Sequence, residues 1–129
     1  MKILHLDSTH SYLSNELEKL GFTNHFDFKS AKKKIENLIS PYCGIIIRSR
    51  IIIDKSLIDK AVNLKFIARF GSGLENIDLD YANTKNIDLP IRTNDSIELV
   101  KQALIGLKYI YKKKKRFHSF SAQLIAKIA

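Results

Sequence analysis

The chain has 129 residues, of which 45% are hydrophobic, and its formal net charge is +9. This length suffices for one domain with a single core, and no apolar run approaches the ~20 residues of a membrane-spanning helix. The opening MKILHL lacks the basic start and the long apolar stretch of a signal peptide, so we expect a cytoplasmic protein. The only cysteine, Cys43, cannot form an internal disulfide, and we interpret it as a core thiol.

Residues 1–92 alternate strand-like and helix-like segments. Gly21 is placed to end the first helix, Ser30 and Asp54 to begin the next two, and Pro41 to close the second. This alternation predicts an α/β domain with a flavodoxin-like parallel sheet and helices on both faces. The expected strands are 2–6, 22–28, 44–48, 66–70 and 87–91, and the expected helices cover 13–20, 30–39, 55–62 and 79–85.

The character of the chain changes after residue 92. Apolar residues at spacings of three to four, from Ile97 to Ile110, predict one long amphipathic helix to about Lys115. Residues 101–116 hold seven basic residues and no acidic one, so most of the positive excess is local to this part. We therefore divide the chain into a domain (1–92), a helix (93–116) and a tail (117–129).

A glycine-rich turn follows the expected strand 66–70. Gly71-Ser72-Gly73 lets the backbone turn sharply and bring its N–H groups close to a ligand. With the helix that follows, the turn could hold a small anion at the mouth of the sheet. On spacing alone, a tight turn without a ligand is the commoner interpretation.

The residues around this turn resemble the substrate-binding domain of D-isomer-specific 2-hydroxyacid dehydrogenases of the phosphoglycerate dehydrogenase kind. The resemblance is an ungapped pattern from Leu64 to Asp78, LKFIARFGSGLENID. It implies that the amides of Ser72, Gly73 and Leu74 hold the substrate carboxylate. It also implies that Asn94 contacts substrate, and that the helix 97–115 packs in a homodimer interface.

A second candidate group is Arg48-Ser49-Arg50, which follows the expected strand 44–48. In a parallel sheet these residues share an edge with the glycine-rich turn, and two guanidinium groups beside free amides suit a doubly charged anion. By resemblance to phosphoglycerate dehydrogenases, Arg48 and Arg50 approach a substrate phosphate and Ser49 adds a hydroxyl. The alternative is that both are surface arginines.

Other parts of the family's machinery are missing from this sequence. No G-x-G-x-x-G follows a strand, and the family's catalytic Arg, Glu and His would lie beyond residue 129. We assign no catalytic residue, expect the nucleotide-binding domain to be absent, and do not expect the family's cofactor, NAD, to bind this chain alone. The histidines have no partners that suggest a dyad, and no metal-binding spacing occurs.

The resemblance thus predicts the substrate-binding part of an NAD-dependent oxidoreductase of serine biosynthesis, truncated and inactive alone. Its ligand would be a small anionic 2-hydroxy or 2-oxo acid, and the arginine pair favours a phosphorylated one. A decayed gene, a frameshift or a domain retained for another use would each explain the truncation.

Two other functions stay open. Lys112 to Arg116, with aromatic residues interleaved, could hold nucleic-acid phosphates and stack bases, although such a run at a helix end is more often a solvated face. The apolar stripe of the helix 97–115 could instead make the chain a dimerisation module.

Overall fold

The structure, a computed structural model, describes residues 1–70, 76–87 and 91–92. Strands and helices alternate along these ranges, and short connections join them. In chain order they are β1 (Lys2–His5), α1 (Ser11–Lys19), β2 (Thr23–Phe26), α2 (Lys32–Leu38), β3 (Tyr42–Ile47), α3 (Lys55–Lys60), β4 (Phe66–Phe70), α4 (Leu79–Thr84) and β5 (Ile91–Arg92).

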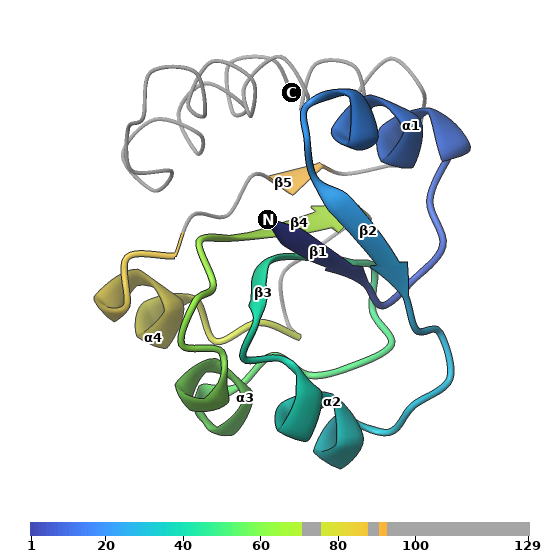
Figure 1. Cartoon of the computed structure of the whole chain (residues 1–129). Helices are drawn as coiled ribbons and strands as arrows, with labels where there is room; N and C mark the ends of the chain where they lie inside the picture. Colours follow the sequence, from blue (N-terminus) through green and yellow to red (C-terminus); the bar gives the residue numbers. More distant parts are fainter. Residues whose placement is uncertain (71–75, 88–90, 93–129) are drawn as a thin grey trace.

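The five strands form one sheet in the order β2-β1-β3-β4-β5, and every neighbouring pair is parallel. Helix α1 covers one face of the sheet, and α2, α3 and α4 cover the other (Figure 1). This is the flavodoxin-like strand order. The predicted parallel α/β sheet with helices on both faces is therefore confirmed within the described residues. The predicted helix 97–115 and the tail 117–129 lie outside them.

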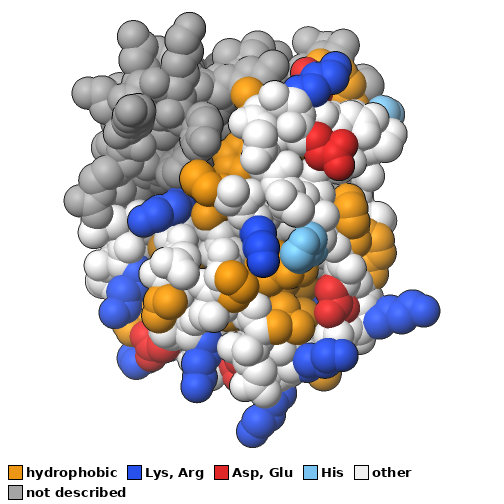
Figure 2. Space-filling model, viewed as in Figure 1, with side chains coloured by type: hydrophobic (Ala, Val, Ile, Leu, Met, Phe, Trp, Pro, Cys, Tyr) orange, Lys and Arg blue, Asp and Glu red, His pale blue; other side chains and the backbone are white. Residues whose placement is uncertain are grey.

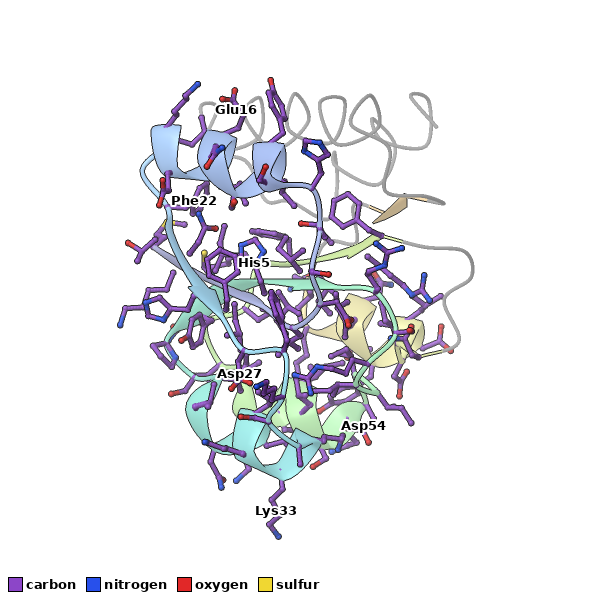
Figure 3. The ribbon with its side chains drawn as sticks, turned by 90° about the vertical axis from the view of Figure 1, so that its right-hand side faces the viewer. His5, Glu16, Phe22, Asp27, Lys33 and Asp54 are labelled. Atoms are coloured by element: carbon purple, nitrogen blue, oxygen red, sulfur yellow. The ribbon has the colours of Figure 1, made fainter. Side chains whose placement is uncertain are left out.

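Alternating side chains of the central strands divide the core into two layers. On the α1 side, Ile3, Ile46 and Phe66 belong to one buried cluster with Leu13 and Leu17 of the helix. Phe22, which lies between α1 and β2, joins this cluster beneath the helix (Figure 3). The other face supplies a larger cluster, which includes Leu4, Ile45, Ile47, Ile67, Ile35 and Leu57. Burial on both faces explains why β3 reads as an unbroken apolar run rather than an alternating one.

The predicted helix ends are mostly confirmed. Gly21 follows α1 with a positive φ of 94°, which glycine adopts without a steric cost. The Asp54 carboxylate accepts a hydrogen bond from the Leu57 amide at 3.2 Å and so caps α3. The prediction that Ser30 begins α2 is wrong. The cap residue is Ala31, which makes no side-chain hydrogen bond, and Ser30 instead donates its amide to the Asp27 carboxylate at 2.9 Å.

Several strand limits also differ from the prediction. β2 is shorter than the predicted 22–28, since Phe22 packs into the core and Asp27 turns into the next loop. β3 begins two residues early, at Tyr42. Ile87 is not part of β5 as predicted, because its amide donates to the Ala82 carbonyl and closes α4; the described part of β5 is Ile91–Arg92. Among the described helices, none combines the length and the apolar character that crossing a membrane requires.

Candidate functional site

The parallel strands place their carboxyl ends along one edge of the sheet, which we call the carboxyl edge. β1 and β3 are neighbours there, and the chain leaves them in opposite directions, to β2 and to β4. In open α/β sheets, the crevice at such a reversal of strand order is where ligands bind. Asp7 follows β1 at this point, and Arg48-Ser49-Arg50, which we call the arginine turn, follows β3.

Asp7 and the arginine turn are joined directly. The Oδ2 atom of Asp7 accepts hydrogen bonds from three successive backbone amides, those of Arg48 at 2.7 Å, Ser49 at 3.1 Å and Arg50 at 3.2 Å. Sequence analysis missed Asp7, because nothing in its local pattern says which amides its carboxylate meets. A short polar residue at the end of the first strand, beside the predicted ligand-binding edge, was the available signal.

The Arg50 guanidinium is bound to three backbone carbonyl groups. It donates from Nε to Leu6 at 2.8 Å, from Nη1 to Ser30 at 2.6 Å and from Nη2 to Asp27 at 2.8 Å. These bonds tie the segments that follow β1, β2 and β3 to one another. Arg50 therefore has a structural role that sequence analysis did not foresee, and its contact with a substrate stays a prediction.

The structure describes only some of the other predicted site residues. The side chains of Arg48 and Ser49 are exposed on the carboxyl edge, as expected for ligand contacts, but the contacts themselves stay predictions. Ser72, Gly73, Leu74 and Asn94 lie outside the described residues. The structure thus brings Arg48, Ser49 and Arg50 together and leaves their convergence with the glycine-rich turn untested.

A second hydrogen-bonded chain supports the same edge. Arg69, near the end of β4, is only 5% exposed, and its Nε donates to the Asn76 side-chain carbonyl at 2.8 Å. The Asn76 amide in turn donates to the Ile51 carbonyl at 3.2 Å. Backbone hydrogen bonds between Ile53 and the segment 76–78 reinforce this link. The segment 48–53 is thus held from both sides, by Asp7 and by Asn76.

Titratable groups near the edge are shifted by burial and by hydrogen bonds. Hydrogen bonds from Ser30 hold the pKa of the Asp27 carboxyl below its usual value. Burial lowers the pKa of the His5 imidazole, and a hydrogen bond with Asn24 at 2.7 Å opposes that shift. Figure 3 places Asp27 between His5 on the sheet and helix α2. His5 is thus a buried histidine whose hydrogen bond to Asn24 serves the structure.

Elsewhere on the surface, basic and acidic side chains lie among one another. On the face drawn in Figure 2, Lys and Arg side chains are dispersed, and acidic side chains lie among them. Some of them are paired, as Lys32 is with Glu36 at 2.7 Å and with Asp54 at 3.1 Å. The basic run 112–116, on which a nucleic-acid site would depend, lies outside the described residues.

The described residues form no metal site, and the sequence of the glycine-rich turn departs from a dinucleotide fingerprint. None of them form a group of three or more His, Cys, Asp or Glu side chains that could hold a metal. Burial raises the pKa of the Cys43 thiol, which opposes the thiolate form that metals need. The turn after β4 reads Gly71-Ser72-Gly73 and then has Asn76 where a dinucleotide fingerprint has its third glycine.

Comparison with known proteins identifies the family. The family model of the D-isomer specific 2-hydroxyacid dehydrogenase catalytic domain matches residues 3–94. The chain belongs to this family. A protein named as a 2-hydroxyacid dehydrogenase from Staphylococcus epidermidis is 44% identical over 55 residues, which are 43% of this chain and 17% of the relative. A similarly named protein from Staphylococcus saprophyticus is 45% identical over 51 residues, 36% of this chain and 16% of the relative.

Solved dehydrogenase structures share the fold. The 3-phosphoglycerate dehydrogenase of Entamoeba histolytica, with NAD+ bound, matches 84% of this chain with a TM-score of 0.64 and 23% identity. The D-lactate dehydrogenase of Escherichia coli matches 87% of it with a TM-score of 0.62 and 18% identity. This chain covers 37% and 36% of those two chains. It therefore spans about a third of the length of these 2-hydroxyacid dehydrogenases.

Proposed function

We propose that this chain is the substrate-binding part of an NAD-dependent D-2-hydroxyacid dehydrogenase. In this proposal it holds a small anionic 2-hydroxy or 2-oxo acid at the carboxyl edge. The observation that carries the proposal is the place of the arginine turn. In a domain of this family, the turn follows β3 at the point where the strand order reverses, which is where ligands of open α/β sheets bind.

The proposed work of this chain is binding and orientation. Arg48 supplies a charged donor to an anionic group of the substrate, while Asp7, Arg50 and Asn76 hold the segment that carries it. Holding a substrate in one orientation lowers the barrier of a reaction whose other reactant is bound separately. NAD, where bound, accepts or supplies the hydride. Because the sequence of the glycine-rich turn departs from a dinucleotide fingerprint, we assign no hydride-transfer step to this chain and expect no turnover by it alone.

Calorimetry with the purified chain tests the proposal. We expect 3-phosphoglycerate to bind and NADH not to bind. Arg48→Gln should weaken binding of 3-phosphoglycerate by about tenfold. The matched control is Lys65→Gln, which also removes one exposed positive charge but lies directly before β4, at the opposite edge of the sheet, and should leave the affinity within about twofold. Equal effects of the two variants would contradict the proposed site.

D-lactate in the same experiment addresses the substrate class. Since Arg50 is bound to three carbonyl groups, the turn offers fewer donors to a phosphate than two arginines suggest. We still expect a phosphorylated ligand, because Arg48 and Ser49 can contact a phosphate. Tighter binding of D-lactate than of 3-phosphoglycerate would exclude a phosphoglycerate-type substrate and retain the 2-hydroxy acid.

The homodimer through residues 97–115 also stays a proposal, which light scattering on Leu104→Glu would test.

A further inference from the structure

Three successive amides of the arginine turn converge on one point. The N–H groups of Arg48, Ser49 and Arg50 all donate to the same oxygen, Asp7 Oδ2, over 2.7 to 3.2 Å. Successive backbone amides that face one point form a concave anion-binding site, called a nest, which proteins commonly use for phosphate and other anions. Here the protein's own half-buried carboxylate occupies the nest.

The occupied nest lies at the candidate site itself. Asp7 follows β1 and the arginine turn follows β3, so the nest bridges the two strands at which the strand order reverses. The Leu6 carbonyl, adjacent to Asp7, also accepts from the Arg50 guanidinium at 2.8 Å. Four hydrogen bonds therefore connect two residues of the β1 end to three residues of the arginine turn.

We propose that Asp7 is a positioning residue for the substrate anion. Its carboxylate takes the place of a bound anion in the nest and fixes the backbone from which the Arg48 side chain extends. The substrate is thereby excluded from the three amides and meets the side chains of the arginine turn instead. This inference rests on the proposed function, because it assigns a role to Asp7 in binding the same ligand.

The charge of Asp7 is essential to this role. Three N–H donors that point at one oxygen are best satisfied by a carboxylate, because hydrogen bonds to an ionised acceptor are about twice as strong as neutral ones. Asparagine at position 7 keeps the shape and one acceptor oxygen but loses the charge. Alanine leaves the three amides without a protein acceptor, and the nest is then open to a small carboxylate from solution.

The test compares Asp7→Ala and Asp7→Asn with the unmodified chain. Affinity for 3-phosphoglycerate is measured by calorimetry, and folding of each variant is checked by its thermal unfolding midpoint. We expect Asp7→Ala to bind at least about tenfold more weakly and Asp7→Asn to be intermediate. The control is Asp54→Ala, which also removes a carboxylate that accepts from a backbone amide, at 3.2 Å. It should lower the midpoint and leave the affinity unchanged.

The effect of formate on binding of 3-phosphoglycerate distinguishes a positioning role of Asp7 from a purely structural one. In the unmodified chain formate can only compete with 3-phosphoglycerate and weaken its binding. In Asp7→Ala, formate should enter the nest, raise the unfolding midpoint and strengthen binding of 3-phosphoglycerate. This opposite sign in the two proteins is the expected result. If Asp7→Ala is folded and binds as tightly as the unmodified chain, or if formate weakens binding in both proteins, the role of Asp7 is overturned.

The two proposals fail in different ways. If the unmodified chain does not bind 3-phosphoglycerate or D-lactate, the proposed function fails, and the positioning role fails with it. If the unmodified chain binds and all Asp7 variants bind equally well, only the positioning role fails. If Asp7→Ala does not fold, Asp7→Asn decides the question, because a folded Asp7→Asn with unchanged affinity contradicts the need for a charge in the nest.

Discussion

Arg69 and Asn76 connect the end of β4 to the segment before α4, with Arg69 Nε donating to Asn76 Oδ1 at 2.8 Å. Asn76 extends the connection to the Ile51 carbonyl at 3.2 Å. Arg69 is 5% exposed, and its Nη1 atom is buried without a hydrogen-bond partner among the described residues. Because a buried charge is costly without acceptors, the Asn76 side chain matters as the acceptor that the described residues provide for Arg69.

Asn76→Ala should therefore destabilise the chain strongly. It removes the acceptor of Arg69 and leaves a buried charged group with still less compensation, so we expect a loss of about 2–3 kcal/mol in urea unfolding. The matched control is Asn63→Ala, which removes an exposed asparagine with a single hydrogen bond, to the Ser40 carbonyl at 2.7 Å, and should cost about 0.5–1 kcal/mol. Combining Asn76→Ala with Arg69→Met should recover part of the loss. Full additivity of the two changes would contradict the link.

The two arginines of the arginine turn should separate stability from binding. Arg50→Gln removes the donors to three carbonyl groups, and we expect it to lower the free energy of unfolding by about 2 kcal/mol or more. Arg48→Gln changes an exposed side chain and should lower the free energy of unfolding less than Arg50→Gln does, while it weakens binding of the anion. Chemical denaturation and calorimetry on both variants check this. The reverse pattern, with Arg50→Gln stable and deficient in binding, would restore the sequence-based role of Arg50.

Gly44 should not tolerate a side chain. A Cβ atom at this position would collide with the ring of Phe66, which is 1% exposed. We expect Gly44→Ala to cost about 1–3 kcal/mol. Phe66→Leu should recover part of that cost when combined with it. Gly21→Ala is the comparison, since its cost of about 1 kcal/mol comes from a φ of 94° in open space, and Phe66→Leu should not reduce it.

His5 should make stability fall as the pH decreases. Burial lowers the pKa of the folded imidazole below its usual value, so between those two values the unfolded chain binds a proton that the folded chain does not. The contribution of His5 is thus fully present above about pH 6.5, the usual pKa, and is lost as the pH falls toward the folded value. His5→Gln should flatten the dependence of unfolding free energy on pH between about 7.5 and 5. An unchanged slope would show that other groups control it.

Local patterns account for much of what sequence analysis predicted correctly. Alternating elements, Gly21 after α1 and Asp54 before α3 are signals carried by a few neighbouring residues, and they gave the parallel sheet and most of its helices. The failures depend on contacts between distant segments. Serine is a residue type that often caps helices. The Ser30 amide, however, donates to the Asp27 carboxylate, and its carbonyl accepts from the Arg50 guanidinium.

At the candidate site too, the features that depend on local sequence were predicted, and those that depend on contacts between distant segments were not. The position of the arginine turn at the carboxyl edge follows from its place after a strand, and it was predicted. Asp7 is more than forty residues from the amides that it binds, and Arg50 is bound to carbonyls of two other loops, at Leu6 after β1 and at Asp27 and Ser30 after β2. Such pairings depend on the folded arrangement of three strands, so no local pattern could have indicated them.

The most direct test of the central claim is a titration of the isotope-labelled chain with 3-phosphoglycerate, followed by NMR. If the chain is a substrate-binding domain that uses the carboxyl edge, the backbone amides of Arg48, Ser49 and Arg50 and the Arg48 Nε–H should shift with a common affinity. Lys65, at the opposite edge, should remain unchanged. Shifts confined to other surfaces, or none at all in a folded chain, would contradict the account.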